Sequence, residues 1–308
     1  MKDRILIATH GNPTSDAAVR VAAEIATREE AHVSVLAVLE PLPVLDAGFS
    51  PAVVPYDAFD RRRGEELLAR VTAQVRTVAG EHCDWPITLA VGRPAAEIVK
   101  ASRADDVSLV VMGIGRHAAA DRLFGSETAL KVSRQSPVPV LAVAPGNAEL
   151  PHRALVATDF SASSFEAARA ALHVLGTPAR LTLAHVRPEP EIPPIAYEEW
   201  LAAYGAGVAE SLGRVRARLA APVTIAVDTV TLSGDPARAI LDYAAAHRMD
   251  VVACGSHGFN FVERLLVGSV ATALLRTAQC SVLLVPATIE SEQTPATRRS
   301  RANAVSFV

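Results

Sequence analysis

Short, almost wholly apolar runs recur along the chain, and segments with helical periodicity separate them. ILIAT (5–9), LVVM (109–112) and ALVAT (154–158) do not alternate apolar with polar residues as a half-exposed strand would. Such runs are typical of parallel strands that helices cover on both faces. Between them, apolar residues return every three or four positions, as over 167–175, which predicts amphipathic helices. Alternating strands and helices in turn predict parallel sheets with right-handed crossovers.

This succession of elements occurs twice. RILIATHGNPTSDAAVRVAAEIA (4–26) is echoed by RALVATDFSASSFEAARAALHVL (153–175), and the later strands and helices repeat in the same order. We therefore predict an α/β fold with two tandem doubly wound, Rossmann-like domains. Each domain would be a five-stranded parallel sheet with helices on both faces. The expected boundaries are 1–146 and 150–287, and the polar, aperiodic residues 288–308 are expected to form a disordered tail.

Composition narrows the classes of partner. A net charge of −3 and a pI near 6.3 give no basic surface for nucleic acid or an anionic membrane. The apolar stretches are far shorter than the ~20 residues that span a bilayer, and the N-terminus does not resemble a signal peptide. Cys83, Cys254 and Cys280 form no CxxC pair or zinc pattern. We expect a cytoplasmic protein without a nucleic-acid or membrane partner and without a metal site.

A glycine-rich loop follows the fourth strand of the second unit. The segment CGSHGFNFVERLLVGSV (254–270) has the spacing G-x2-G-x9-G-S, in which Gly268 and Ser269 open the next helix. A helix N-terminus carries free N–H groups and partial positive charge, which suits phosphate. Gly255 and Gly258 would let a ligand approach the bare backbone. The alternative is that the glycines only make turns and that Ser269 is an N-cap.

A carboxylate stands at the tip of the first strand of the same unit. Asp159 could accept hydrogen bonds from an adenine amino group or from ribose hydroxyls. The alternative is an Asx turn that leads into the following helix. Ser163 with Glu166 three residues later predicts a capping box at the start of that helix.

These features together resemble a known family, the universal stress proteins in their tandem two-domain form. The resemblance rests on LVATDFS, LTLAHV, GDPARAI, DVVACGSHG and LLVGSVATALLRTAQCSVLLV. In the nucleotide-binding branch of that family, the G-x2-G-x9-G-S loop holds the phosphates and ribose of ATP, with or without Mg²⁺. The resemblance implies phosphate and ribose contacts from Gly255, His257, Gly258, Gly268, Ser269 and Val270. It implies base contacts from Thr158, Asp159 and Val186.

The first unit departs from this pattern. In MGIGRHAAADRLFGSE (112–127) only one residue separates the first two glycines, and Glu127 places negative charge at the helix start. His10 stands where the second unit has Asp159. We expect the fold to survive here with a degenerate nucleotide site. Its weaker candidate residues are Gly113, Gly115, Arg116, Gly125 and Ser126.

Catalysis has little support in the sequence. No lysine accompanies the glycine loop, and no paired carboxylates or Ser-His-Asp pattern can be assigned to it. We therefore expect a stress-response or regulatory protein that binds an adenine nucleotide and hydrolyses ATP slowly at most, with no assigned catalytic residue. ATP, AMP and a cyclic nucleotide remain open as ligands.

A second reading is a dimeric interaction scaffold that binds no nucleotide. In the family, fifth-strand edges commonly pair domains, and SPVPVLAVAP (136–145) and CSVLLVP (280–286) are short, apolar edge candidates of that kind. Self-association through them would give a pseudo-dimer within the chain or a homodimer. Proline-rich loops at 40–60 and 187–200 could contact a partner. An enzyme of the wider adenine-nucleotide hydrolase-like group is the third reading, and it lacks recognisable catalytic residues.

Overall fold

The structure is a computed structural model, and it describes residues 4–41, 56–115, 126–146, 149–189, 194–219, 221–256 and 268–286. The expected tail, 288–308, lies outside these residues. The strands of the first half are β1 (Arg4–Ala8), β2 (His32–Leu39), β3 (Ile87–Val91), β4 (Val107–Gly113) and β5 (Val140–Val143). Those of the second half are β6 (Arg153–Ala157), β7 (Ala179–Arg187), β8 (Ile225–Ser233), β9 (Val251–Gly255) and β10 (Ser281–Val285).

Helices alternate with these strands, as the apolar periodicity predicted. Those of the first half are α1 (Asp16–Glu29), α2 (Tyr56–Ala79), α3 (Pro94–Ala101) and α4 (Ser126–Gln135). Those of the second half are α5 (Ala162–Val174), α6 (Pro194–Leu219), α7 (Pro236–Ala246) and α8 (Ser269–Thr277). Pro94 and Pro236 each open a helix, where the missing N–H costs least. A short 3₁₀ helix, Pro13–Ser15, precedes α1 and was not expected.

The strand order is that of a doubly wound sheet in both halves. The full order is β3-β2-β1-β4-β5-β10-β9-β6-β7-β8, and the pairs within each half are parallel. The order reverses between β1 and β4, and again between β6 and β9. The predicted fold class is therefore confirmed. In sheets of this kind, ligands bind beyond the carboxyl ends of the strands at such a reversal point.

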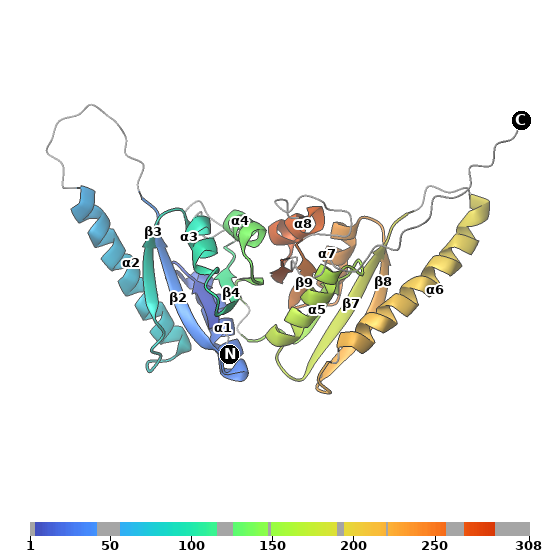
Figure 1. The fold of residues 1–308 in the computed structure, drawn as a ribbon, viewed down its shortest axis with the longest axis horizontal. Helices are drawn as coiled ribbons and strands as arrows, with labels where there is room; N and C mark the ends of the chain where they lie inside the picture. The colour runs from blue at the N-terminus through green and yellow to red at the C-terminus, as the bar shows by residue number, and fades with distance from the viewer. Residues whose placement is uncertain are drawn as a thin grey trace, which may run out of the picture.

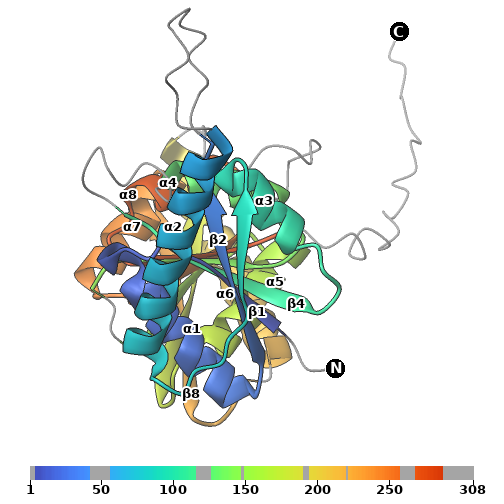
Figure 2. The same ribbon diagram turned by 90° about the vertical axis from the view of Figure 1, so that its left-hand side faces the viewer.

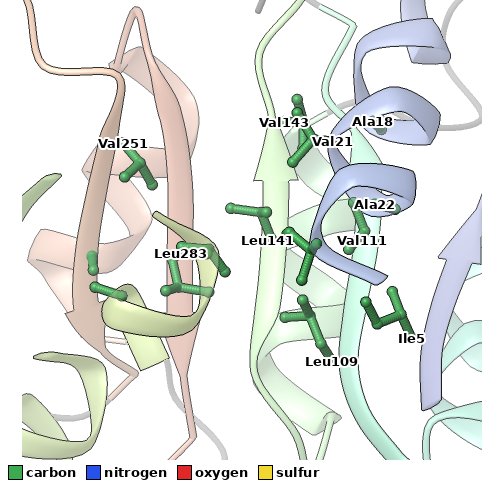
Figure 3. Close-up of a cluster of buried hydrophobic side chains, with 14 of the residues drawn as sticks. Ile5, Ala18, Val21, Ala22, Leu109, Val111, Leu141, Val143, Val251 and Leu283 are labelled. Atoms are coloured by element: carbon green, nitrogen blue, oxygen red, sulfur yellow. The ribbon is translucent and has the colours of Figure 1, made fainter. Parts of the chain in front are cut away.

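The two halves meet through their fifth strands. β5 and β10 pair antiparallel and join the sheets into one of ten strands. Leu141 lies opposite Leu283 in this register, and both are fully buried (Figure 3). The two predicted fifth-strand edges are thus occupied by each other within the chain. The outer edges of the joined sheet are β3, which Figure 2 shows flanked by α2 and α3, and β8.

Helices cover both faces of the sheet (Figure 1). Buried residues of α1, α2, α5 and α6 share one hydrophobic cluster, and those of α3, α4, α7 and α8 share the other. Strand residues supply both clusters, because successive side chains point to opposite faces. None of the helices in the described part of the chain is long and apolar enough to cross a membrane.

Arginine side chains link the two halves on both faces of the sheet. On one face the Arg28 guanidinium donates to the carbonyl oxygens of His173 and Leu175 at the end of α5. On the other face α4 and α8 lie side by side (Figure 1). Arg276 of α8 contacts Glu127 of α4 at 2.8 Å. The negative charge expected at the start of α4 is therefore paired with a cation from the second half.

Candidate functional site

A pocket of about 270 Å³ lies at the reversal point of the second half, beyond the carboxyl ends of β6 and β9. The ends of β6, β7 and β9, the first turns of α7 and the N-terminus of α8 surround it. Its lining residues are Ala157, Thr158, Asp159, Ser164, Ala184, His185, Val186, Pro236, Ile240, Cys254, Gly255, Ser256, Gly268, Ser269, Val270 and Ala271. The fold therefore brings the two sequence features together, the carboxylate at the strand tip and the end of the glycine loop.

The predicted binding residues can now be placed one by one. Those that line the pocket are Thr158, Asp159, Val186, Gly255, Gly268, Ser269 and Val270. His257 and Gly258 lie outside the described residues. The sequence analysis missed the apolar walls, of which Ile240 and Pro236 come from α7. Their signal was present in GDPARAIL, where Pro236 opens a helix and Ile240 falls on its buried face.

Asp159 makes an Asx turn into α5, the alternative role that its sequence context predicts. Its Oδ1 accepts a hydrogen bond from the Ser161 N–H at 3.1 Å and one from the Ser161 hydroxyl at 2.5 Å. The Ser161 Oγ accepts in turn from the Ser164 N–H at 3.2 Å and caps α5. One carboxylate oxygen thus fixes the start of the helix, and the same residue lines the pocket.

The predicted capping box at Ser163 and Glu166 is wrong. α5 begins at Ala162, so Ser163 already lies inside the helix and Ser161 is the N-cap. Glu166 pairs with Arg169 on the surface instead. Three serines near this start could each cap a helix, and the Asx turn at Asp159 selects the first of them.

Gly255 is required by packing. A Cβ at this position would lie 2.7 Å from the Ser163 Oγ and 2.9 Å from the Ser163 Cβ. Gly113 is in the same situation in the first half, where a Cβ would lie 3.0 Å from the Ser15 Cα. In both halves the glycine that ends the fourth strand allows the first helix to pack closely. Its presence is therefore no evidence for a ligand.

Gly268 is different, because the described fold does not require a glycine there. Its backbone has φ −55° and ψ 156°, which any residue can adopt. The nearest described atom to a Cβ would be the Ser256 carbonyl oxygen at 3.7 Å, an ordinary contact. Gly268 is the N-cap of α8, where Ser, Thr, Asp or Asn would bond the helix end. A hydrogen at this position leaves the start of α8 open to the pocket.

The first turn of α8 supplies donors to the pocket. The Gly268 N–H donates to the Ser256 carbonyl at 2.9 Å and so fixes the helix start. The N–H groups of Ser269, Val270 and Ala271 follow, and helix geometry leaves them without an intrahelical acceptor. The side chain of Ser269 is exposed. The N-terminal end therefore presents partial positive charge to anything in the pocket.

Cys254 contributes an uncharged wall. Burial raises the pKa of the Cys254 thiol to about 12, and the negative charge of Asp159 adds to the effect. The thiol is therefore protonated at neutral pH and resembles a small apolar side chain. This excludes a thiolate nucleophile in the pocket. Among the described residues, no three His, Cys, Asp or Glu side chains are grouped as a metal site.

The first half keeps the frame of the site but changes its chemistry. Thr9 and Thr158 occupy equivalent positions, and their N–H groups donate to Leu36 and Ala184. His10 therefore replaces Asp159. Burial lowers the pKa of His10, and the nearby Arg70 and Arg63 guanidinium groups lower it further. Of the weaker candidates, Gly113, Gly115 and Ser126 lie in the described part of the chain, and Arg116 and Gly125 lie outside it.

The lowered pKa of His10 predicts a pH-dependent stability. Below about pH 6.5, the ordinary pKa of histidine, the unfolded chain takes up a proton that folded His10 resists. The unfolded state then binds more protons, and the free energy of unfolding falls with falling pH. Urea unfolding at pH 7.5 and 5.5 should show a smaller loss for His10→Gln than for the wild type. His82→Gln, a change at an exposed position, serves as the control variant. Equal losses of unfolding free energy between pH 7.5 and 5.5 in His10→Gln and wild type would contradict the prediction.

Comparison with known proteins gives the family. The universal stress protein family model matches residues 1–144 and again residues 151–286. The chain belongs to the universal stress protein family. A universal stress protein of Methanocaldococcus jannaschii is 34% identical over 76 residues, which are 25% of this chain and 44% of that protein. A Staphylococcus haemolyticus protein described as a universal stress protein is 43% identical over 61 residues, 19% of this chain and 36% of that protein.

Structural similarity extends over both halves of this universal stress protein. A crystal structure of a universal stress protein from Archaeoglobus fulgidus aligns with a TM-score of 0.61 at 21% identity. The alignment covers 92% of this chain and 96% of that one. At this identity the likeness shows the fold alone. The chain covers less than half of each sequence relative named above, so their activities are not transferred from these matches.

Proposed function

We propose that the second half binds an adenine nucleotide, ATP, and that the protein acts in stress response or regulation with at most slow ATP hydrolysis. The observation that carries the proposal is Gly268. The described fold does not require a glycine there, and one is present where the N-terminus of α8 opens into the pocket. Close approach of a ligand is a physical reason for a glycine that no described residue supplies.

The residues that line the pocket suit the base, the ribose and the phosphates of an adenine nucleotide. Ala157, Val186 and Ile240 give apolar walls suited to a flat base. Asp159 is the only acidic side chain among the described lining residues, and a carboxylate accepts from amino or hydroxyl groups. The N–H groups at the start of α8 suit phosphate. If Mg²⁺ accompanies ATP, the phosphates and the Asp159 carboxylate would be its charged ligands, since Asp159 is the one acidic side chain of the described lining.

The described residues support a binding role more than catalysis. Besides Asp159, the lining has no carboxylate, lysine or arginine to position water or neutralise a transition state. The thiols of Cys83 and Cys254 form no disulfide, which supports a reducing compartment, and we place the protein in the cytoplasm. Pairing of separate chains is a further part of this proposal, and it would have to use surfaces other than β5 and β10.

Nucleotide content and stoichiometry test the proposal. The purified full-length chain is denatured, and the released material is analysed by mass and absorbance for adenine nucleotides. The nucleotide-free chain is then titrated with ATP, ADP, AMP and cyclic AMP by calorimetry. We expect about one site per chain, because His10 replaces the carboxylate in the first half. If no adenine nucleotide is released and none binds, the proposal is wrong and the scaffold reading takes its place. Two equal sites would contradict the asymmetry between the halves.

A further inference from the structure

The turn after the first strand holds a bulky ring in a strained conformation in the second half. Phe160 directly follows Asp159 and has φ +65°, in the left-handed region. A bulky residue there is an outlier that the surrounding structure must hold in place. Gly11 has the equivalent position in the first half, with φ +73°. The turn is therefore left-handed in both halves, but only the second half places a side chain on it.

His185 of β7 contacts this ring and the strand tip together. The rings of Phe160 and His185 stack with centroids 4.6 Å apart. The Nδ1 of His185 lies 2.9 Å from the carbonyl oxygen of Thr158, the residue before Asp159. A carbonyl oxygen only accepts, so Nδ1 carries the hydrogen. His185 thus contacts both neighbours of Asp159, the backbone of Thr158 and the ring of Phe160.

Tyr204 of α6 fixes the imidazole from the other side. Its hydroxyl lies 2.8 Å from the His185 Nε2, which accepts from it in the neutral ring. The Tyr204 ring stacks on Trp200 at a centroid distance of 4.8 Å. His185 is 9% exposed, and its hydrogen bond to the Thr158 carbonyl is buried, while the one to Tyr204 is partly buried. The imidazole therefore has one orientation set by partners at both nitrogens.

The first half provides an internal comparison. Ala8 pairs with Leu36, and Ala157 pairs with Ala184 in the equivalent register. The next residue along is Ala37 in the first half and His185 in the second. The half that lacks the carboxylate also lacks the ring and the imidazole. The second half has the carboxylate, the Phe160 ring and the His185 imidazole. Gly11 and Ala37 of the first half show that the turn and the buried strand form without the ring and the imidazole.

We propose that Phe160, His185 and Tyr204 are positioning residues that hold the Thr158–Asp159 tip so that the Asp159 carboxylate meets the base or ribose of the nucleotide. This inference rests on the proposed function. It assigns to this cluster part of the selectivity for a nucleoside triphosphate over a bare triphosphate. His185 lies at the edge of the pocket, while Phe160 and Tyr204 pack against the hydrophobic cluster on the face opposite α7 and α8. The cluster acts through Asp159 and does not touch the phosphates.

The test separates the nucleoside end from the phosphate end. His185→Leu removes both hydrogen bonds, and His185→Asn restores an N–H near the Thr158 carbonyl. We expect His185→Leu to weaken ATP binding by about tenfold, the loss typical of one polar contact to a charged group. Tyr204→Phe should have a smaller effect in the same direction, and His185→Asn should recover part of the loss. Affinity for inorganic tripolyphosphate, measured by calorimetry on the same full-length variants, should be unchanged.

Two controls make the result decisive. In an Asp159→Asn background, His185→Leu should have little further effect on ATP binding, because both changes act on one contact. Tyr243→Phe alters a tyrosine of α7 that stacks on another histidine, His247, the C-cap of that helix, and should leave affinity unchanged. Three outcomes would each overturn the inference. The folded His185→Leu variant could bind ATP as the wild type does, or it could lose tripolyphosphate affinity as much as ATP affinity. It could also lose its full share of ATP affinity in the Asp159→Asn background. A wild type that binds no ATP contradicts the proposed function instead.

Discussion

Replacing Gly268 with Glu is expected to reduce ATP affinity at least 100-fold while the chain remains folded. The new carboxylate would stand at the N-cap of α8, where the proposed phosphates meet the helix N-terminus. Repulsion between like charges and loss of space then act together, and a change of about 2.7 kcal/mol corresponds to this factor. The fold should tolerate the side chain, since the nearest described atom to a Cβ is 3.7 Å away. Calorimetric titration with ATP measures the affinity, and thermal unfolding measures the fold.

A charge-matched variant separates the local effect from the added charge. Gly213→Glu adds one carboxylate on an exposed turn of α6, where a Cβ would meet nothing within 4 Å. It should bind ATP as the wild type does. Gly268→Ala, with no added charge, should give an intermediate loss if the ligand approaches the backbone closely. Unchanged ATP affinity in Gly268→Glu would show that the phosphate assignment is wrong, whatever the other variants do.

The fold could be predicted because the determinants of a doubly wound sheet are local and occur twice. Uniformly apolar runs such as 154–158 mark buried parallel strands, and the repeat shows that the chain forms the same unit again. The pairing of β5 with β10 could not be predicted to the same degree. An apolar edge indicates that a strand will pair, but a partner in the same chain and a partner in another chain present the same backbone groups. The structure pairs them within the chain.

The sequence predicted which residues line the pocket better than it predicted which of them are needed for packing. Gly255 and Gly268 are both glycines of one motif. A Cβ at Gly255 would clash with Ser163, whereas a Cβ at Gly268 would meet no described atom closer than 3.7 Å. Sequence spacing cannot distinguish these causes, since each depends on a helix distant in the chain. His185 was missed because a single polar residue in a strand has many structural roles. Only the contacts with Thr158 and Tyr204 give it a specific one.

Replacing Gly255 with Ala is expected to destabilise the protein by about 1–3 kcal/mol, the range for inserting a methyl group into a packed site. The new Cβ would lie 2.7 Å from the Ser163 Oγ, 2.9 Å from its Cβ and 3.1 Å from its carbonyl carbon. The last two atoms move only with the helix, so α5 must shift. Gly113→Ala should cost less, because its closest contact would be 3.0 Å. Urea unfolding at constant pH gives both free energies of unfolding.

A compensating substitution decides whether this contact is the cause. Ser163→Gly removes the two side-chain atoms that a methyl group at position 255 would meet, at a cost of up to about 1 kcal/mol in helix propensity. The double variant should therefore be more stable than the two single losses added together predict. Simple additivity would mean that the glycine is needed for another reason, and close approach of a ligand would then become a reason for Gly255 as it is for Gly268. Rescue would instead show that Gly255 is needed for the packing of α5, so that Gly268 alone of these two glycines would be explained by access to the N-terminus of α8.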